Sequence, residues 1–467
     1  MASRRSYAER VIEPDDEPTQ VVEPPTRGRR SRRVAIGLMV GLLALGAGAA
    51  VSQLAGSKPA ERPPTAVAPT APTSALRATP DLDEQRATAL QALLEVRARA
   101  VLDHDERAWL STLDPQSSAF TVKQAAVFAN LRDVPFSAFT YEFDGVATPL
   151  STDRREQLGQ SAWVARVIAE HRLAGYDRTS AQTEQYLTVV RREGKWYLAA
   201  DTDGETVPEP WDLGRVRVVR GDGVLVMGTA DLAELKNFAA AGERAVGRVT
   251  KVWGTKWPRR AVLVVPRTEA EMGKLLLRRE GLDQVAAVTS GELSGGGSGE
   301  AGSDRVVINP AAFLRLGVSG QRVVLTHEMT HVAVRSSTSA PVPTWLSEGF
   351  ADYIGYQGVG LGTRTVAADV LALVRQGEGF TGLPTPEDFD PTLTTIAPAY
   401  SAAWLACSLI ADRYGTPALV QLYRTAAASE GEDPETALTQ AFRSVLGTSE
   451  ADFTKAWLDH LSALAAA

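Results

Sequence analysis

The chain has 467 residues, a formal net charge of −7, 44% hydrophobic residues and 22% charged residues. This is the composition of a globular protein, and its mildly acidic balance argues against a dedicated nucleic-acid binder, which would carry a basic domain. The single cysteine excludes an intramolecular disulfide framework and cysteine-based zinc sites. Only five histidines are present, so two that stand close together deserve a chemical explanation.

The amino-terminal end is predicted to be a disordered tail followed by a transmembrane helix. Residues 1–33 are polar and rich in Arg, Glu and Pro, so they cannot bury enough surface to fold. Residues 34–56 carry no charge and are almost all apolar or small, which is long enough to cross a bilayer core of ~30 Å. Because the arginines cluster before this span, the amino terminus is expected in the cytoplasm and the folded domains outside the cell.

A cleaved signal peptide is the alternative to this membrane anchor. Ala47-Gly48-Ala49 has the small-residue spacing of a cleavage site, and Arg32-Arg33 resembles part of a twin-arginine signal. Cleavage would release a secreted protein, so both interpretations export the folded part. Residues 57–80 are rich in Pro, Ala and Thr and are expected to form a semi-extended linker.

Residues 81–207 are predicted to form an α+β domain. Leu90, Leu94 and Val101 belong to an apolar set at helical spacing, and further helical sequence follows before the period changes. Four strands rich in Val, Tyr, Phe and Thr are then expected at 137–149, 162–174, 183–192 and 196–201.

This order of elements resembles the nuclear transport factor 2-like fold, a cone of curved antiparallel sheet around a helix. The resemblance includes the hairpin at Glu193-Gly194-Lys195. Domains of this fold can be enzymes or passive spacers, and a structural or docking module is expected here because no paired His/Asp constellation stands out. His104 and His171 are interpreted as ordinary surface or strand residues.

Residues 208–467 are predicted to form a second domain, a small mixed sheet followed by helices. Pro208 and Pro210 mark its start, and Gly221-Asp222-Gly223 joins two short apolar runs as a hairpin. A long helix, two apolar strands and a mostly helical remainder follow. The stretch 291–303 is rich in Gly and Ser and is expected to be a flexible loop.

The strongest motif in the chain is His327-Glu328-x-x-His331, which lies among apolar residues. Positions four apart share one face of a helix, so His327 and His331 can bind one metal ion. Glu328 is directed to the side of that face and can act on water as a base without being a ligand. The apolar neighbours predict a buried helix, which suits a dry and rigid metal site.

A third ligand is expected on the next helix, because catalytic zinc takes three protein ligands and keeps one position open. The segment 345–353 follows a proline-rich break and carries Glu348. Asp352 lies one helical turn further on the same face and can accept a hydrogen bond from the outer nitrogen of a liganding histidine.

These two helices resemble those of the gluzincin metallopeptidases, the thermolysin and aminopeptidase N type. Trp345–Ala351 is close to the aminopeptidase form of the second helix, and the spacing from Glu348 to Asp352 matches the thermolysin form. The resemblance implies Zn²⁺ bound by His327, His331 and Glu348, and a peptide or protein substrate. Glu328 would be the general base.

The resemblance also implies a donor that stabilises the oxyanion, here a tyrosine, since the only histidine beyond the motif is His460. Tyr400 is the candidate, because it lies near the start of a predicted helix about fifty residues beyond Glu348, a placement similar to aminopeptidase N. The other downstream tyrosines are Tyr353, Tyr356, Tyr414 and Tyr423.

Two features depart from the aminopeptidase pattern. The separation between His331 and Glu348 is slightly shorter, and no Gly-x-Met-Glu-Asn motif precedes the metal helix. The absence of that motif gives no support for recognition of a free amine.

Three functions remain possible from the sequence: a membrane-anchored zinc endopeptidase, a non-catalytic surface scaffold with a peptidase-like domain, and a gluzincin hydrolase of a non-peptide amide or ester.

Overall fold

The structure, a computed structural model, describes residues 82–147, 149–278, 282, 285–290, 302–390, 393–428 and 431–467. The predicted tail 1–33, span 34–56 and linker 57–80 lie outside the described residues, as do residues 291–301 of the glycine-rich loop. Within the described residues, no helix is both long and apolar enough to cross a membrane.

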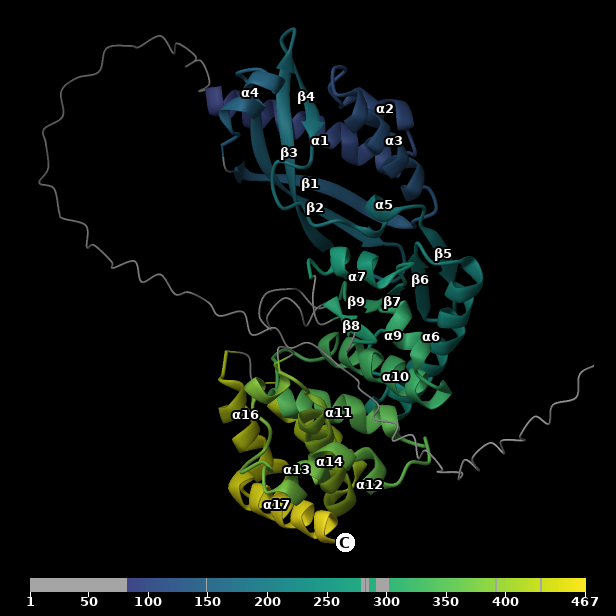
Figure 1. Ribbon diagram of the computed structural model, residues 1–467, viewed down its shortest axis with the longest axis vertical. Coiled ribbons are helices and arrows are strands. Elements are labelled where there is room, and N and C mark those ends of the chain that lie inside the picture. Colours follow the sequence, from purple (N-terminus) through teal and green to yellow (C-terminus); the bar gives the residue numbers. More distant parts are fainter. Residues whose placement is uncertain are drawn as a thin grey trace, which may run out of the picture. The chain divides into compact units, whose positions relative to one another are not determined.

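The first folded region is an α+β unit, as the sequence predicts (Figure 1). Three helices precede an antiparallel sheet of order β1-β2-β3-β4. The sequence does not predict α4, because seven residues are too few to show helical periodicity. The bounds are α1 Leu82–Leu102, α2 Glu106–Ser111, α3 Ser118–Leu131, β1 Phe136–Val146, α4 Thr152–Leu158, β2 Trp163–Leu173, β3 Ala181–Arg192 and β4 Lys195–Ala200.

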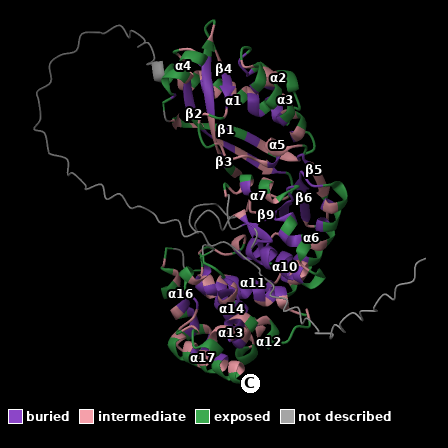
Figure 2. Ribbon diagram, viewed as in Figure 1, coloured by how far each residue is buried: buried purple, intermediate pink, exposed green. Residues whose placement is uncertain are grey.

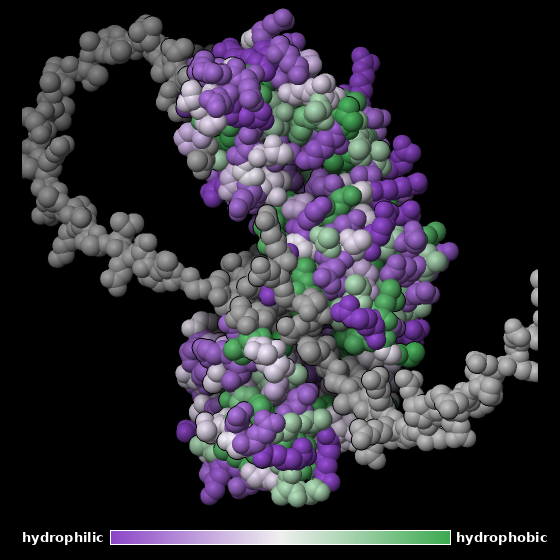
Figure 3. Space-filling model, in the orientation of Figure 1, coloured by the Kyte–Doolittle hydropathy of each residue, from purple (hydrophilic) through white to green (hydrophobic). Residues whose placement is uncertain are grey.

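Alternation along the strands gives this sheet a buried face. Ala165, Val167 and Leu173 of β2 are fully buried and share one core with Leu90 and Leu94 of α1. The surface of this region drawn in Figure 3 is mainly hydrophilic, as expected when the apolar side chains lie inside.

The hairpin between β3 and β4 closes on Glu193 and Gly194, with φ of 47° and 85°. Positive φ at both central residues is the geometry that tight two-residue hairpins require. The order of helices and antiparallel strands is therefore observed, while the cone-like curvature of the nuclear transport factor 2-like fold stays a prediction.

A mixed five-stranded sheet forms the start of the second region. Its order is β5-β6-β7-β9-β8, with β6, β7 and β9 parallel and both outer strands antiparallel to their neighbours. The sequence predicts this mixed sheet but misses β8, which has only three residues. The bounds are β5 Arg217–Arg220, β6 Val224–Gly228, β7 Ala261–Val264, β8 Ala287–Thr289 and β9 Arg305–Ile308.

Helices make up most of the rest of the chain, as predicted. Helix α6 packs on β6 and on α10, and α11 packs between α10 and α14. Figure 2 shows buried residues along α10, α11 and α14. The bounds are α5 Pro210–Leu213, α6 Leu232–Trp253, α7 Glu269–Leu275, α9 Pro310–Arg315, α10 Val318–Arg335, α11 Thr344–Tyr356, α12 Thr363–Val366, α13 Ala368–Gln376, α14 Ala397–Tyr414, α15 Thr416–Ala426, α16 Pro434–Ala441 and α17 Glu450–Ala466, with short turns η2 Pro386–Phe389 and η3 Phe442–Leu446.

A glycine allows α11 and α14 to approach closely. A Cβ atom at Gly349 would clash with the carbonyl oxygen of Ala403 and would lie 2.9 Å from Sγ of Cys407. Any side chain at this position would push α11 away from α14 and move Glu348, the neighbouring residue. Cys407 is fully buried here, and burial raises the pKa of its thiol, so it packs as a small apolar residue.

The turn between β2 and β3 fastens the two sheets to each other. Asp177 accepts two hydrogen bonds of 2.7 Å from the guanidinium of Arg305, at the start of β9. Arg178 donates to the carbonyl of Ser336, directly after α10, at 2.8 Å. The amino-terminal unit therefore contacts the end of the helix that carries the histidine pair.

Candidate metal centre

Helix α10 brings His327 and His331 together. Every residue of this helix from Val323 to Val334 is buried, the polar ones included. The two imidazoles stand one turn apart, and their Nε2 atoms are 3.0 Å from each other. Both rings are almost completely shielded from solvent. This arrangement presents two nitrogen donors to one point.

Glu348 of α11 faces the same point. Helix α11 starts directly after Pro343, and this places Glu348 over the histidine pair. Its Oε2 lies 3.3 Å from Nε2 of His327 and 3.7 Å from Nε2 of His331. The three ligand atoms lie within 4.8 Å of one another.

These residues fit a zinc ion. Oε2 of Glu348 is buried and makes no hydrogen bond to any described residue, which is costly for a carboxylate oxygen unless a cation satisfies it. Two imidazole nitrogens and one carboxylate are a known ligand set of catalytic zinc, with a fourth position left for water or substrate. His327, His331 and Glu348 thus form a zinc-type site.

Asp352 fixes the orientation of one ligand. Its Oδ1 lies 2.8 Å from Nδ1 of His327, and both side chains are buried. A hydrogen bond at Nδ1 leaves Nε2 of the same ring to bind a metal. Burial by itself would lower the pKa of His327, but the charges of Asp352 and Glu348 outweigh it and raise the pKa well above its usual value.

Glu328 points to a partner that the sequence does not reveal. Its side chain is fully buried, and Oε2 accepts a hydrogen bond of 2.8 Å from Oγ1 of Thr289, the last residue of β8. Thr289 is 39 positions upstream, and β8, with three residues, is too short to show the alternating pattern of a strand in the sequence. The only sequence clue is the short apolar run that ends in a threonine.

Tyr400 also lies beside the cluster. Its ring centroid is 6.4 Å from that of His327 and 5.2 Å from that of Phe389. Three other candidate tyrosines have different surroundings: Tyr356 packs on Trp404, Tyr423 on Phe350, and Tyr353 shares a hydrogen bond with Thr416. Helix α14 therefore brings Tyr400 next to a metal-ligand ring.

Comparisons with known proteins give a distant structural likeness. No protein-family model matches the chain, and no curated protein matches it. The chain resembles a mutant of a two-domain M1 zinc metallopeptidase bound to L-arginine, at 17% identity and a TM-score of 0.32. That match covers 64% of this chain and 61% of the other, less than two thirds of its length.

A second resemblance is to the M1 zinc metallopeptidase from Deinococcus radiodurans, at 16% identity and a TM-score of 0.31. It covers 70% of each chain. Likeness at this level is too low to transfer an activity or a substrate to this chain.

Proposed function

We propose that this protein is a zinc-dependent peptidase. The observation that carries the proposal is the buried convergence of His327, His331 and Glu348, with the carboxylate of Glu328 on the same helix as both histidines. A structural histidine pair would not need three convergent ligand atoms and a second buried carboxylate beside them. Metal-assisted hydrolysis needs all of these groups.

The residues divide the chemistry among them. Zinc, when bound, supplies Lewis acidity that polarises the scissile carbonyl and makes water a better nucleophile. Glu328 takes the proton from the attacking water and passes it to the leaving amine. Thr289 holds Oε2 of Glu328 through its hydroxyl, so that the carboxylate keeps one orientation. Tyr400 donates from its hydroxyl to the oxyanion that develops on the substrate.

The placement of β8 supports a peptide substrate. This strand is the last in the sheet order found among the described residues, and it ends at Thr289, the partner of the proposed base. An extended peptide can add to such an edge through backbone hydrogen bonds, with its side chains alternating between the two faces. A scissile bond carried along β8 would then reach Glu328 and the metal ligands.

Cleavage of an unstructured protein such as casein by the full chain, purified in mild detergent, tests this proposal. The wild type should carry one zinc per chain and cleave casein. The variant Glu328→Gln should keep its zinc and lose about 10²- to 10⁴-fold in kcat/KM. Glu378→Gln, at an exposed glutamate, is the matched control and should leave both quantities unchanged.

Other outcomes separate the competing functions. A zinc-loaded wild type that cleaves no peptide bond would contradict the proposal and leave a binding scaffold. Hydrolysis confined to non-peptide amides or esters would move the site to the third function. Full activity in Glu328→Gln would refute the role of Glu328 as base.

We also propose that residues 34–56 anchor the chain in the cell membrane, with the amino terminus cytoplasmic and the two folded regions outside. The proposal rests on the uncharged run and the arginines before it. A protease added outside intact cells should degrade residues 81–467 and spare the tail. Protection of the folded regions would contradict export, and their recovery from the medium would favour the cleaved signal.

A further inference from the structure

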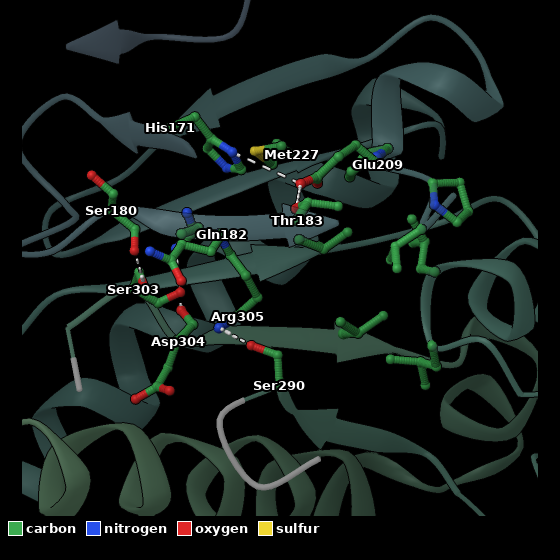
Figure 4. Close-up of a pocket in the computed structure, with 18 of the residues that line it drawn as sticks. His171, Ser180, Gln182, Thr183, Glu209, Met227, Ser290, Ser303, Asp304 and Arg305 are labelled. Atoms are coloured by element: carbon green, nitrogen blue, oxygen red, sulfur yellow. Dashed lines mark hydrogen bonds and ion pairs between the residues drawn. The ribbon is translucent and has the colours of Figure 1, made fainter. Parts of the chain in front are cut away.

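A cavity of about 610 Å³ lies between the two sheets, and none of the three metal ligands lines it. Residues of β2 and β3 line one side of it, and residues of β6, β7 and β9 line the other (Figure 4). Its volume is in the range of small-molecule pockets. The metal-site chemistry does not use this cavity, so its lining requires a separate explanation.

One carboxyl group that lines the cavity is only 16% exposed. Glu209, in the segment that joins the two sheets, accepts a hydrogen bond from Oγ1 of Thr183. Nδ1 of His171 is 3.8 Å from Oε1 of Glu209 (Figure 4). Burial raises the pKa of Glu209 to about 7 and, together with the charge of Arg305, lowers the pKa of His171 to about 3. The histidine is therefore neutral and supplies no positive charge to the glutamate.

The cations of the cavity are already paired. Arg305 binds Asp177 through two hydrogen bonds of 2.7 Å, and Nε of Arg335 lies 3.3 Å from Oδ1 of Asp304. Each arginine is thus balanced by its own aspartate. Among the groups that line the cavity, the carboxyl of Glu209 is the one acid without a matching base within the described part of the chain.

The remaining wall is part polar and part apolar, and Ser180, Gln182, Ser290 and Ser303 line its polar part. Met227, Val264 and Val307 come from three neighbouring strands of the mixed sheet, and Leu275 and Leu276 from the end of α7. A ligand that lies against this apolar part of the wall and reaches Glu209 must present a group that satisfies a largely buried carboxylate. A positively charged hydrogen-bond donor makes the strongest partner for such a group.

We propose that the cavity binds a small organic ammonium ion with an apolar body. The ammonium group hydrogen-bonds to Glu209, and the apolar body lies against Met227, Val264 and Val307. The site is distinct from the metal centre and does not depend on the proposed peptidase activity. Ligands that lack the positive charge leave Glu209 without a cation and bind more weakly.

Titration calorimetry of the full chain in mild detergent tests this site with three probes of similar size: n-hexylamine, hexan-1-ol and hexanoate. At neutral pH only the amine is cationic. We expect one hexylamine to bind per chain, with hexanol and hexanoate weaker by about tenfold or more. Glu209→Gln should weaken hexylamine binding by a similar factor. Because wild type and variant carry the same micelle, uptake by detergent cancels in this comparison.

Two further variants locate the site. Ala181→Phe places a ring at the cavity wall and should abolish binding without touching a charge. His331→Asn removes a metal ligand and should leave hexylamine affinity unchanged. Circular dichroism checks that each variant is folded. If Glu209→Gln does not fold, the binding measurement on Ala181→Phe tests the location of the site.

Three results would overturn the proposal. Hexanol could bind as tightly as hexylamine, which would show that charge plays no part. Affinity could be lost in His331→Asn and kept in Ala181→Phe, which would place the amine at the metal centre. Hexylamine could also fail to bind at millimolar concentration, which would leave the cavity without the proposed ligand class.

Discussion

Two histidine–carboxylate clusters in this chain, each with a buried histidine, have opposite protonation behaviour. His327 lies 2.8 Å from Asp352 and 3.3 Å from Glu348, and the two carboxylates raise its pKa despite burial. His171 lies 3.8 Å from Glu209, beyond hydrogen-bond distance, and burial lowers its pKa to about 3. Burial alone therefore does not decide the charge of a histidine; the number of carboxylates and their distance do.

The surroundings explain why only the first cluster is built for a metal. Around His327, a second imidazole and a carboxylate converge on one point. Around His171, aromatic rings take that space, with centroids 5.7 Å away for Phe136 and 5.3 Å away for Trp211. Within the described residues, His171 belongs to no group of three potential metal ligands, and it packs in the core of the sheet.

The largest expected effect is a loss of zinc and activity when a histidine of the metal centre is replaced, compared with the same replacement at His171. His331→Asn removes one of three ligands, so bound zinc should fall from one per chain to nearly none and cleavage should stop. His171→Asn, the matched control, should keep both zinc and cleavage. Elemental analysis after dialysis measures the metal. Equal zinc loss in the two variants would erase the distinction between the clusters.

A smaller effect is expected from Asp352→Asn. The amide keeps the size of the side chain but removes the charge that orients and strengthens His327. Zinc affinity or activity should fall by about 10- to 100-fold, as for other partners of metal-bound histidines. Competition with a fluorescent chelator gives the affinity. An unchanged affinity and rate would mean that the 2.8 Å contact has no part in metal binding.

Substitution of Thr289 should have the next largest effect, and this effect should be a decrease in kcat. Thr289→Val keeps the shape but removes the hydroxyl that holds Glu328, so we expect a loss of about tenfold in kcat with KM and zinc content unchanged. Thr289→Ser restores a hydroxyl and should recover most of the rate. If serine and valine behave alike, Thr289 serves packing and not the orientation of Glu328.

The smallest effect concerns stability at the second cluster. Folded His171 stays neutral down to about pH 3, whereas an unfolded histidine takes up a proton near its usual value of 6.5, so falling pH through this window favours unfolding. Folded Glu209 keeps its proton up to about pH 7, above its usual value of 4.5, so rising pH through that window favours unfolding. The two groups therefore oppose each other between pH 4.5 and 6.5, where the two windows overlap.

Single variants should separate these two contributions. His171→Gln should gain stability relative to wild type as the pH falls from 6.5 to 3, and Glu209→Gln should gain as the pH rises from 4.5 to 7. Tm across this pH range measures both, and differences of several degrees are expected. Parallel curves for wild type and both variants would contradict these pKa directions.

Sequence alone predicts those parts of the fold and the site that depend on local periodicity. The spacing of His327 and His331 on one helix, and of Glu348 and Asp352 on the next, follows from the geometry of a helical turn. Thr289 could not be foreseen, because its contact with Glu328 depends on a three-residue strand and a tertiary approach.

The second cluster was equally hidden from sequence reasoning. The sequence correctly places His171 in a strand. Its neighbours in the sequence do not show that Glu209, 38 positions further along the chain (209 − 171), lies beside it in the fold. The cavity depends on how two sheets are fastened by Asp177 and Arg305, which is a tertiary property without a local pattern.

An anomalous-scattering map at the zinc absorption edge tests the central distinction most directly. Crystals of the full chain grown with zinc should show one strong peak, bounded by Nε2 of His327, Nε2 of His331 and the carboxylate of Glu348. No peak should appear between His171 and Glu209. A peak at the second cluster, or none at the first, would contradict the assignment of the metal centre.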